Sequence, residues 1–303
     1  MKVRVRVGNQ EIDLSNLGKI FWPESGYTKG DLVDYYTRVA PVLLPHLRDR
    51  PLVVTRYPDG ITGKAFYQKN LPDHTPEWVG TFPYYSPHSA RTINFCVVHN
   101  LETLVWLSNQ ACLELHPWLS RCDRPDYPDY AVFDLDPDPP AGYDDAVEVA
   151  KTVKTLLDEL RLAAGLKTSG ATGLHIYVPL ARSYTYEVVR RFVEEVGRLI
   201  ERVLPEKVTL ERTVGRRKGK VYIDYLQNVR GKTIVAPYSV RPLEGAPVSA
   251  PITWDELDHV APRALNIKTI PDRIRQVGDV FRSTLGRGQN LDQALKDLGI
   301  EEI

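Results

Sequence analysis

The sequence predicts an α+β protein in which helices cover a sheet, and two observations support this prediction. Short alternating or continuous apolar segments, typical of strands, recur along the chain. Between residues 131 and 226 they are interspersed with two long helical patterns. With 303 residues, 43% of them hydrophobic and 26% charged, the chain has the composition of a folded globular protein and the length of one large domain or two joined lobes.

The first part of the chain predicts strands and two helices. Val3, Val5 and Val7 alternate with charged residues, which is the period of a half-buried strand. Thr28 followed by Asp31 is a capping signal, so a helix is expected over residues 28–40. Strands are expected over 52–57 and 92–98, with an exposed Pro-, Tyr- and Ser-containing loop at 83–87, and a second helix over 101–115.

The rest of the chain follows a Pro- and Asp-rich turn at residues 124–129. Strands are expected over 131–135, 166–168, 174–180, 208–210, 221–226 and 233–237, and helices over 143–162 and 186–203. Thr253 and Glu256 have the spacing of a capping box, and Asn290 is placed to open a last short helix.

Charge and hydropathy restrict the partners and the location. Lys+Arg 39 balances Asp+Glu 39, so no overall field draws the protein to nucleic acid or membrane, and such a partner must be held by local patches. The sequence has no uninterrupted run of about 18 apolar residues, and its first residues alternate Lys and Arg with Val. Three cysteines cannot all pair, which fits a reducing compartment. We therefore expect a cytoplasmic protein without a membrane partner.

Two aspartates end an apolar strand pattern, Asp134 and Asp136, followed by Pro137. Side chains alternate along a strand, so both carboxylates share one face, where a hard divalent cation such as magnesium or manganese would offset their repulsion. Asp and Pro are also common in plain turns. Asp224, within the apolar strand pattern 221–226, adds a third carboxylate that is costly to bury without a partner. Three such aspartates are what a two-metal phosphoryl-transfer site needs.

A glycine-containing turn separates the strands expected over 166–168 and 174–180. Its backbone N–H groups can point at phosphate oxygens, and His175, opening the next strand, could donate to the same phosphates. Alone, such a turn is usually a hairpin and a single histidine is usually structural. Arg241 follows the last expected strand and can hold a phosphate with two hydrogen bonds, although by itself it also fits a surface arginine.

Together these motifs resemble a known family. Phe-Asp134-Leu-Asp136-Pro, Thr-Ser169-Gly-x-x-Gly-x-His175 and Asp224-Tyr-Leu-Gln-Asn look like the polymerase domain of bacterial ATP-dependent DNA ligase D, in the archaeo-eukaryotic primase superfamily. Residues 15–19, 27–31 and 66–72 also resemble it, so the resemblance covers nearly the whole chain. It implies a single primase-polymerase domain over 1–303. An N-terminal α/β lobe (about 1–120) would pack on an RRM-like catalytic lobe (121–250) around one cleft, with a helical tail (251–303).

The resemblance also implies the activity. The chain would be a metal-dependent nucleotidyltransferase that extends primer 3′ ends and fills short gaps during non-homologous end joining. It would prefer ribonucleoside triphosphates and use two manganese or magnesium ions held by Asp134, Asp136 and Asp224. His116, expected on the helix before the aspartates, would contribute to polymerisation or merely pack. The residues implied to bind the incoming triphosphate are Ser169, Gly170, Thr172, His175, Arg241 and Arg56.

Further residues are implied to bind DNA. Asn16, Lys19 and Lys29 would bind the 5′-phosphate across a gap, since lysine is a point charge for phosphate, and Phe66 with Tyr67 would stack on template bases. Lys29 also fits an ordinary first-turn helix residue, and Phe66 fits a core residue. Arg216 and Arg217 lie in a basic stretch expected to be a hairpin loop, either solvated or in contact with the DNA backbone.

One position departs from the family: members commonly have Lys or Arg where Thr172 stands, so one charge at the triphosphate is missing or supplied elsewhere. The chain also lacks the Lys-x-Asp-Gly motif of a ligase nucleophile, because Asp59, in its only Asp-Gly, follows Pro58. We therefore do not expect it to seal nicks. It would act on gaps or broken ends with Ku and a separate ATP-dependent DNA ligase, or be a piece of a larger protein.

Three other functions stay open at this point. A true primase would make a dinucleotide de novo. A metal-dependent phosphodiesterase or nuclease could use the same carboxylates and would degrade DNA without added nucleotide. A non-catalytic end-binding module would keep its function in Asp134→Ala.

Overall fold

The structure of the protein is a computed structural model, in which residues 2–86 and 89–300 are described. The chain forms two compact units, each assembled from three stretches. Unit 1 comprises Met1–Trp118, Val235–Ala250 and Ala261–Asp279, and unit 2 comprises Leu119–Ile234, Pro251–Val260 and Val280–Ile303. The stretch 251–303, expected as a separate helical tail, is thus shared between the units. Among the described residues, no helix has the length and apolar character needed to cross a membrane.

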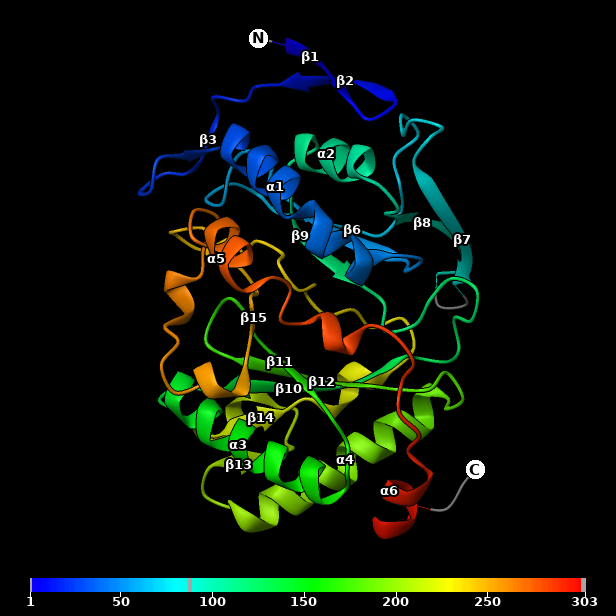
Figure 1. Ribbon diagram of the computed structural model, residues 1–303, viewed down its shortest axis with the longest axis vertical. Coiled ribbons are helices and arrows are strands. Elements are labelled where there is room, and N and C mark those ends of the chain that lie inside the picture. Colours follow the sequence, from blue (N-terminus) through cyan, green and yellow to red (C-terminus); the bar gives the residue numbers. More distant parts are fainter. Residues whose placement is uncertain (1, 87–88, 301–303) are drawn as a thin grey trace. The chain divides into compact units, whose positions relative to one another are not determined.

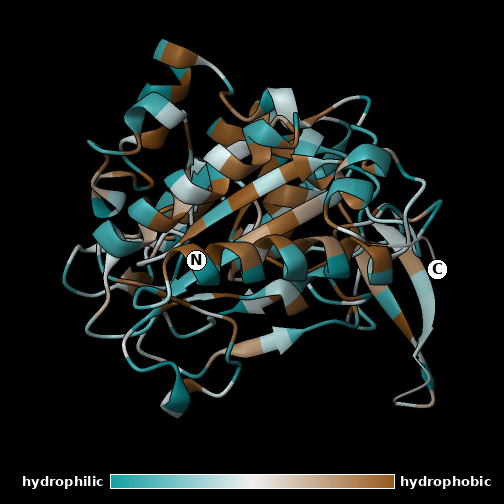
Figure 2. Ribbon diagram, turned by 90° about the horizontal axis from the view of Figure 1, so that it is seen from below, coloured by the Kyte–Doolittle hydropathy of each residue, from teal (hydrophilic) through white to brown (hydrophobic). Residues whose placement is uncertain are grey.

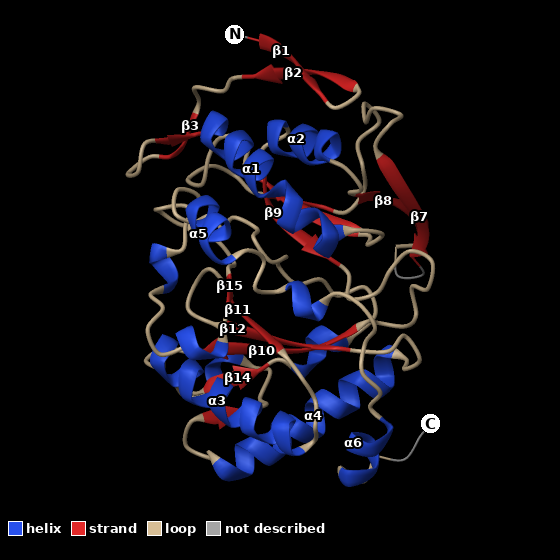
Figure 3. Cartoon of the chain, viewed as in Figure 1, coloured by secondary structure: helices blue, strands red, loops and turns tan. Residues whose placement is uncertain are grey.

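Unit 1 is built on a five-stranded antiparallel sheet in the order β6-β5-β8-β7, with β9 paired to β5. Helices α1 and α2 pack on each other and contribute to a core shared with β5 and β9 (Figure 3). The sheet strands are β5 (Leu52–Arg56), β6 (Phe66–Gln68), β7 (Gly80–Ser86), β8 (Arg91–Val97) and β9 (Cys112–Pro117). The other elements are β1 (Lys2–Val7), β2 (Gln10–Ser15), β3 (Ile20–Trp22), β4 (Tyr27–Thr28), α1 (Lys29–Leu47), α2 (Leu101–Asn109), η4 (Pro262–Ala264) and α5 (Ile270–Val277).

The capping signal at the start of α1 is confirmed. The Thr28 hydroxyl accepts a hydrogen bond from the Asp31 amide at 3.2 Å, and the Asp31 carboxylate accepts one from the Thr28 amide at 2.8 Å. The helix does not end near residue 40 but continues past two prolines to Leu47. Its apolar face continues as well, with Leu43 and Leu47 buried, so core packing outweighs the helix-breaking tendency of proline.

Two expectations for unit 1 are wrong. The helix expected over 101–115 ends at Asn109, because Ala111 adopts a left-handed backbone conformation (φ 62°) and the chain then pairs with β5 as β9. Residues 83–86, expected as a loop, belong to β7, an edge strand that tolerates Pro83. Phe82 and Tyr84 pack on the cluster that contains Trp118. Residue 87, the end of the expected loop, lies outside the described residues.

Unit 2 is built on a six-stranded sheet in the order β13-β14-β10-β12-β11-β15. Helices α3 and α4 both lie on one face of it (Figure 1), and Phe133 on β10 contacts Phe192 on α4. Figure 2 shows hydrophobic and hydrophilic residues alternating along the helical ribbons, as amphipathic helices require. The strands are β10 (Tyr130–Pro137), β11 (Gly165–Thr168), β12 (Leu174–Pro179), β13 (Val208–Thr209), β14 (Val221–Ile223) and β15 (Pro251–Ile252). The helices are α3 (Tyr143–Glu159), α4 (Tyr186–Val203), α6 (Asp292–Asp297), η1 (Val214–Arg216), η2 (Tyr225–Asn228), η3 (Trp254–Glu256) and η5 (Arg282–Thr284).

Two further expectations are corrected. The strand expected over 221–226 ends at Ile223, and Asp224 caps the short helix η2 instead. No strand forms over 233–237. There the Ala236 amide donates to the Leu115 carbonyl, and Pro237, which has no N–H, begins a turn. The capping box of Thr253 with Glu256 is confirmed.

Candidate functional site

The first two aspartates lie near the end of β10. Phe133 points to the helix-covered face of the sheet, so the alternation of side chains places Asp134 and Asp136 on the opposite face. Asp134 is buried and Asp136 is half-buried. The strand thus presents two carboxylates on the face that α3 and α4 do not cover.

Asp224 is brought beside Asp134 by the turn that follows β14. Its amide donates to the Asp134 carbonyl at 2.9 Å, and its carboxylate accepts from the Leu226 amide and the Tyr222 hydroxyl, both at 3.0 Å. The fully buried Asn228 anchors η2, since its side-chain amide donates to the Val132 carbonyl and accepts from the Val132 amide, each at 2.8 Å. The turn is therefore held firmly against β10.

The electrostatics of this pair favour a cation. Burial, followed by the negative charge of Asp134, raises the pKa of Asp224 above its usual range. No group of three or more His, Cys, Asp or Glu side chains in the described part of the chain already converges as a cation site. The hard oxygen donors of Asp134, Asp136 and Asp224 nevertheless fit magnesium or manganese, because a divalent cation would remove the repulsion that raises this pKa.

A polar row crosses three neighbouring strands next to Asp134. Register pairs Asp134 with His175, and His175 with Lys167. His175 Nε2 lies 3.1 Å from Asp134 Oδ1, and Lys167 Nζ lies 2.6 Å from His175 Nδ1. With Lys167 donating to Nδ1, the imidazole carries its proton on Nε2, the ring nitrogen that faces Asp134. Gln227 Nε2 donates to the other Asp134 oxygen at 3.1 Å, so each carboxylate oxygen has a polar side chain beside it.

The turn after β11 is organised by Ser169. Its hydroxyl accepts from the amides of Ala171 and Gly173 at 3.1 and 3.0 Å. Gly170 has a left-handed backbone (φ 75°), and a Cβ at Gly173 would lie 2.4 Å from the Leu135 carbonyl oxygen, so neither position readily accepts a side chain. Thr172 is exposed at the tip of the turn. The structure thus brings the Ser-Gly turn against the aspartate strand β10.

Arg241 and His116 lie in unit 1, linked by one carboxylate. Arg241 Nε is 3.1 Å from Glu114 Oε1, and His116 Nε2 is 3.6 Å from Glu114 Oε2. His116 also lies 3.3 Å from the Thr55 hydroxyl. It is on strand β9, contrary to the expected helix.

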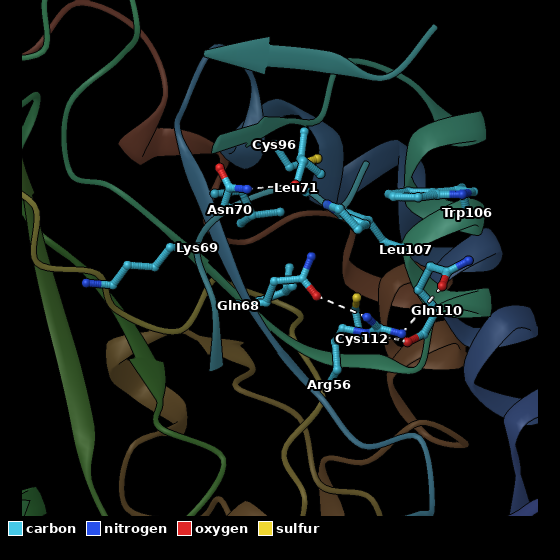
Figure 4. A pocket seen from close by; sticks show the side chains of 13 residues that line it. Arg56, Gln68, Lys69, Asn70, Leu71, Cys96, Trp106, Leu107, Gln110 and Cys112 are labelled. Atoms are coloured by element: carbon cyan, nitrogen blue, oxygen red, sulfur yellow. Dashed lines mark hydrogen bonds between the residues drawn. The ribbon is translucent and has the colours of Figure 1, made fainter. Parts of the chain in front are cut away.

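Arg56 follows Thr55 at the end of β5 in the same unit. Figure 4 shows its guanidinium between Gln68 and Gln110, while Lys69 extends away from the other labelled side chains. Arg56 donates to the Gln110 carbonyl at 2.8 Å and to the Gln68 side chain at 3.0 Å. The pocket that it lines holds about 10 Å³ of space, enough for one water. Its role toward a triphosphate stays a prediction.

The residues expected to bind a 5′-phosphate gather at the start of unit 1. Asn16 and Lys19 line a pocket of about 450 Å³. Lys29 is buried, and its Nζ donates to the Ser15 carbonyl at 2.6 Å. Burial, with the nearby charges of Lys19 and Arg56, lowers the pKa of Lys29 to about 8.

The expected template-binding aromatics are exposed on β6, Phe66 at 46% and Tyr67 at 57%, so Phe66 is not a core residue. Lys64 and Lys69 lie over their rings, at 5.5 and 5.9 Å from the ring centres. In unit 2, the basic stretch is not the expected hairpin loop, because the strands on either side of it, β13 and β14, pair in parallel. Arg216 is exposed on η1, and the Arg217 guanidinium lies 4.0 Å from the ring centre of Tyr222.

The comparisons with known proteins decide the family. The model of the family described as "LigD, primase-polymerase domain" matches residues 28–281. This chain belongs to that family. The LigD primase-polymerase domain is a nucleotidyltransferase domain, and a polymerase family of this kind implies divalent cations and nucleoside triphosphates. The family proposed from the sequence motifs is therefore confirmed.

Relatives and a solved structure agree with the family model. The chain is 36% identical over 274 residues to the bifunctional non-homologous end joining protein LigD of Bacillus subtilis, covering 89% of this chain and 44% of that protein. It is 34% identical over 276 residues to the multifunctional LigD of Mycolicibacterium smegmatis, covering 90% and 36%. The chain spans less than half the length of these relatives. The polymerase domain of Mycobacterium tuberculosis ligase D, solved in complex with DNA, matches with a TM-score of 0.85 and 32% identity over 91% of this chain and 98% of that chain. The predicted α+β primase-polymerase fold is confirmed.

Sequence reasoning gave no role to three residues that contact the candidate LigD site residues: Lys167, Gln227 and Glu114. Gln227 lies within a motif that indicated the family and Lys167 directly precedes another, so their positions carried a signal. Glu114 precedes His116 by two residues, but the expected helix hid the strand alternation that places both side chains on one face.

Proposed function

We propose that this domain extends primer 3′ ends from nucleoside triphosphates, prefers ribonucleotides, and fills short gaps during non-homologous end joining. Asp134, Asp136 and Asp224 would hold two manganese or magnesium ions. The observation that supports this most is the convergence of β10 and the β14–η2 turn, which sets the half-buried Asp224 beside the buried Asp134. Membership of the LigD primase-polymerase family makes polymerisation the reaction for which such a pair is suited.

In the proposed reaction, the primer 3′-hydroxyl attacks the α-phosphate of the nucleotide in line. The O3′–Pα bond forms, the bond from Pα to the oxygen bridging to the β-phosphate breaks, pyrophosphate leaves, and the hydroxyl proton passes to solvent. The bound cations would make the hydroxyl easier to ionise and neutralise charge on the phosphates. The contribution of the protein is positioning, since His175 and Gln227 orient the Asp134 carboxylate.

Nucleotide binding is proposed for residues of both units. In unit 2 the Ser169 hydroxyl and the turn that contains Gly170 would contact the triphosphate with His175. Thr172 supplies no charge there. In unit 1, Arg241 is proposed to bind phosphate, Arg56 to assist, and His116 to support polymerisation.

DNA is the proposed polymeric partner. The similar polymerase domain of Mycobacterium tuberculosis ligase D was solved in complex with DNA. Here Asn16, Lys19 and Lys29 would bind the 5′-phosphate, and the exposed Phe66 and Tyr67 would stack on template bases. Because the matched relatives are named as end-joining proteins, Ku and an ATP-dependent DNA ligase are proposed partners.

Extension of a gapped DNA with a downstream 5′-phosphate tests this function. Wild type is compared with Asp134→Asn, using ribonucleotides or deoxyribonucleotides with manganese or magnesium. Wild type should add ribonucleotides, and Asp134→Asn should lose activity by about 10³-fold or more, since a metal ligand contributes several kcal/mol to transition-state stabilisation. Asp158→Asn is the matched control, because Asp158 is an exposed aspartate of α3 that pairs with Lys154.

The other outcomes separate the competing functions. No extension with any metal would reject the polymerase function. DNA loss without added nucleotide would favour a phosphodiesterase, and dinucleotide synthesis without a primer would favour a primase. End bridging that survives in Asp134→Asn, with no extension by wild type, would favour a non-catalytic module.

A further inference from the structure

Glu114 is a buried carboxylate that contacts two residues of proposed function without a proposed function of its own. It is 7% exposed, and its two oxygens lie 3.1 Å from Arg241 Nε and 3.6 Å from His116 Nε2. Glu114 pairs with Thr55 on the neighbouring strand β5, and the Thr55 hydroxyl is 3.3 Å from the same imidazole nitrogen. One side chain therefore fixes both a guanidinium and an imidazole.

Buried residues on the opposite face of β9 support this cluster. Leu113 and Leu115 alternate with Glu114 and are fully buried, which directs Glu114 and His116 to the other face of β9. The buried Tyr36 hydroxyl donates to the Leu113 carbonyl and accepts from the Val240 amide. The same tyrosine thus ties β9 to the segment that leads into Arg241.

The segment has a second anchor. The Leu115 amide donates to the Ser239 hydroxyl at 2.9 Å, and the Arg241 amide donates to the Pro247 carbonyl at 2.8 Å. The backbones of Glu114 and Arg241 are therefore placed by buried hydrogen bonds, and the ion pair with Glu114 restrains the arginine side chain.

Glu114 is kept ionised for this contact. Burial opposes its negative charge, but the nearby His116 imidazole and the charge of Arg241 hold the pKa of Glu114 below its usual value. A neutral amide of the same shape would keep the volume and lose the charge. Such a change would leave the half-buried Arg241 without its carboxylate.

We propose that Glu114 is a positioning residue that holds Arg241 by Nε and His116 by Nε2, so that the terminal nitrogens of Arg241 are presented to the nucleotide phosphates in a fixed orientation. This inference rests on the proposed function, in which Arg241 and His116 serve the nucleotide and the reaction. A pre-oriented guanidinium binds phosphate without first losing side-chain freedom.

The test is a double-mutant cycle with two readouts. Glu114→Gln, Arg241→Ala and the double variant are compared with wild type for binding of a non-hydrolysable ribonucleoside triphosphate with manganese, and for KM and kcat in gap extension. Glu114→Gln should raise the nucleotide Kd and KM by about tenfold, which lies within the range of coupling energies between residues that share an ion pair. In the Arg241→Ala background the same change should raise the Kd by less than about twofold, since the partner is already gone.

A matched control and a conservative variant distinguish positioning from stability. Glu194 also bridges two cations, Arg190 at 2.6 Å and Arg198 at 2.7 Å, on α4 of unit 2. Glu194→Gln should leave Kd and KM unchanged. Glu114→Asp keeps the charge but shortens the reach, so it should fold as wild type does and raise the Kd by less than Glu114→Gln. If Glu114→Gln does not fold, the nucleotide Kd of Glu114→Asp tests the positioning role instead.

The outcomes separate the inference from the proposed function. Additive effects in the cycle, or unchanged Kd in both Glu114 variants, would overturn the positioning role even in an active polymerase. If wild type extends no primer yet binds nucleotide in a manner that requires Glu114 only when Arg241 is present, the inference holds and the polymerase function fails. If wild type binds no nucleotide, both fail.

Discussion

The aspartate pair of unit 2 and the lysine site of unit 1 are charged in opposite senses but share one electrostatic problem. Burial raises the pKa of Asp224 and lowers the pKa of Lys29 to about 8. In both cases a like charge nearby, Asp134 for the first and Lys19 for the second, adds to the effect. Each site is therefore less stable in its charged form than an exposed side chain would be.

The difference between the two sites is the ligand that each one calls for. A buried carboxylate beside a half-buried one is stabilised by a divalent cation, whereas a buried lysine beside a second lysine is stabilised by an anion such as phosphate. Without such a ligand, hydrogen bonds hold both side chains in place. Asp224 accepts from Tyr222 and Leu226, and Lys29 donates to Ser15. The comparison predicts that removing charge should help folding at both sites while harming function.

Asp224→Asn should show this opposition most strongly. It removes a charge that we propose binds metal, so gap extension should fall by about 10³-fold or more. It also relieves the repulsion with Asp134 while the amide oxygen still accepts from Leu226 and Tyr222. The melting temperature of the metal-free protein should therefore rise. Activity and thermal unfolding in a chelator are the two measurements.

The exposed Asp158 again serves as control, because Asp158→Asn should change neither quantity appreciably. A fall in melting temperature for Asp224→Asn would show that the two carboxylates are not in conflict. That result would remove the electrostatic reason for a cation between them.

The acidic site could be predicted from the sequence because its signals are local. Asp134 and Asp136 sit two apart in an apolar strand pattern, and strand alternation alone puts them on one face. Asp224 was predicted as a strand residue, but it caps η2. A three-residue strand followed by a short helix has the same apolar pattern as one longer strand, so the side-chain period could not separate them.

The cluster of Glu114, His116 and Arg241 in unit 1 was harder to predict because its contacts are distant in sequence. Arg241 meets Glu114 across more than a hundred residues, and the chain that carries it forms no strand. The turn at Ala111, a residue with no intrinsic preference for a left-handed backbone, ends α2 early and creates β9. No local sequence pattern predicts that turn, so only the structure shows that Glu114 and His116 lie side by side.

Lys29→Met should produce an effect of about tenfold, by removing the preference for a downstream 5′-phosphate in gap filling. Wild type should lose part of the same preference as the pH rises past about 8, since Lys29 is then discharged. Bound phosphate opposes this loss by favouring the charged lysine. Extension of gaps with and without the 5′-phosphate, from pH 7 to 9, measures both effects.

The lowered pKa of Lys29 also makes the stability of the protein depend on pH. The pKa of Lys29 in the folded protein is about 8, below its ordinary value of 10.5. Below pH 8 Lys29 is charged in the folded and the unfolded protein, so burying the charge lowers the free energy of unfolding by its full amount. This cost declines as the pH rises from 8 toward 10.5. Wild type should therefore gain stability relative to Lys29→Met over that range. Lys154→Met, at a lysine of α3 paired with Asp158, should show neither trend. Parallel curves for wild type and Lys29→Met would contradict a buried, titrating Lys29.

The smallest expected effect separates two neighbouring arginines of unit 2. Arg216 is exposed, so Arg216→Ala should only weaken DNA binding and reduce the slope of log K against log salt by about 1. Arg217 lies over Tyr222, which donates to Asp224, so Arg217→Ala should in addition lower kcat. Arg263→Ala, at an exposed arginine of unit 1, controls for the loss of one charge. Equal effects of Arg216→Ala and Arg217→Ala on kcat would mean that the ring contact does not reach the aspartate site. A salt slope unchanged by Arg216→Ala would leave its loop solvated rather than bound to DNA.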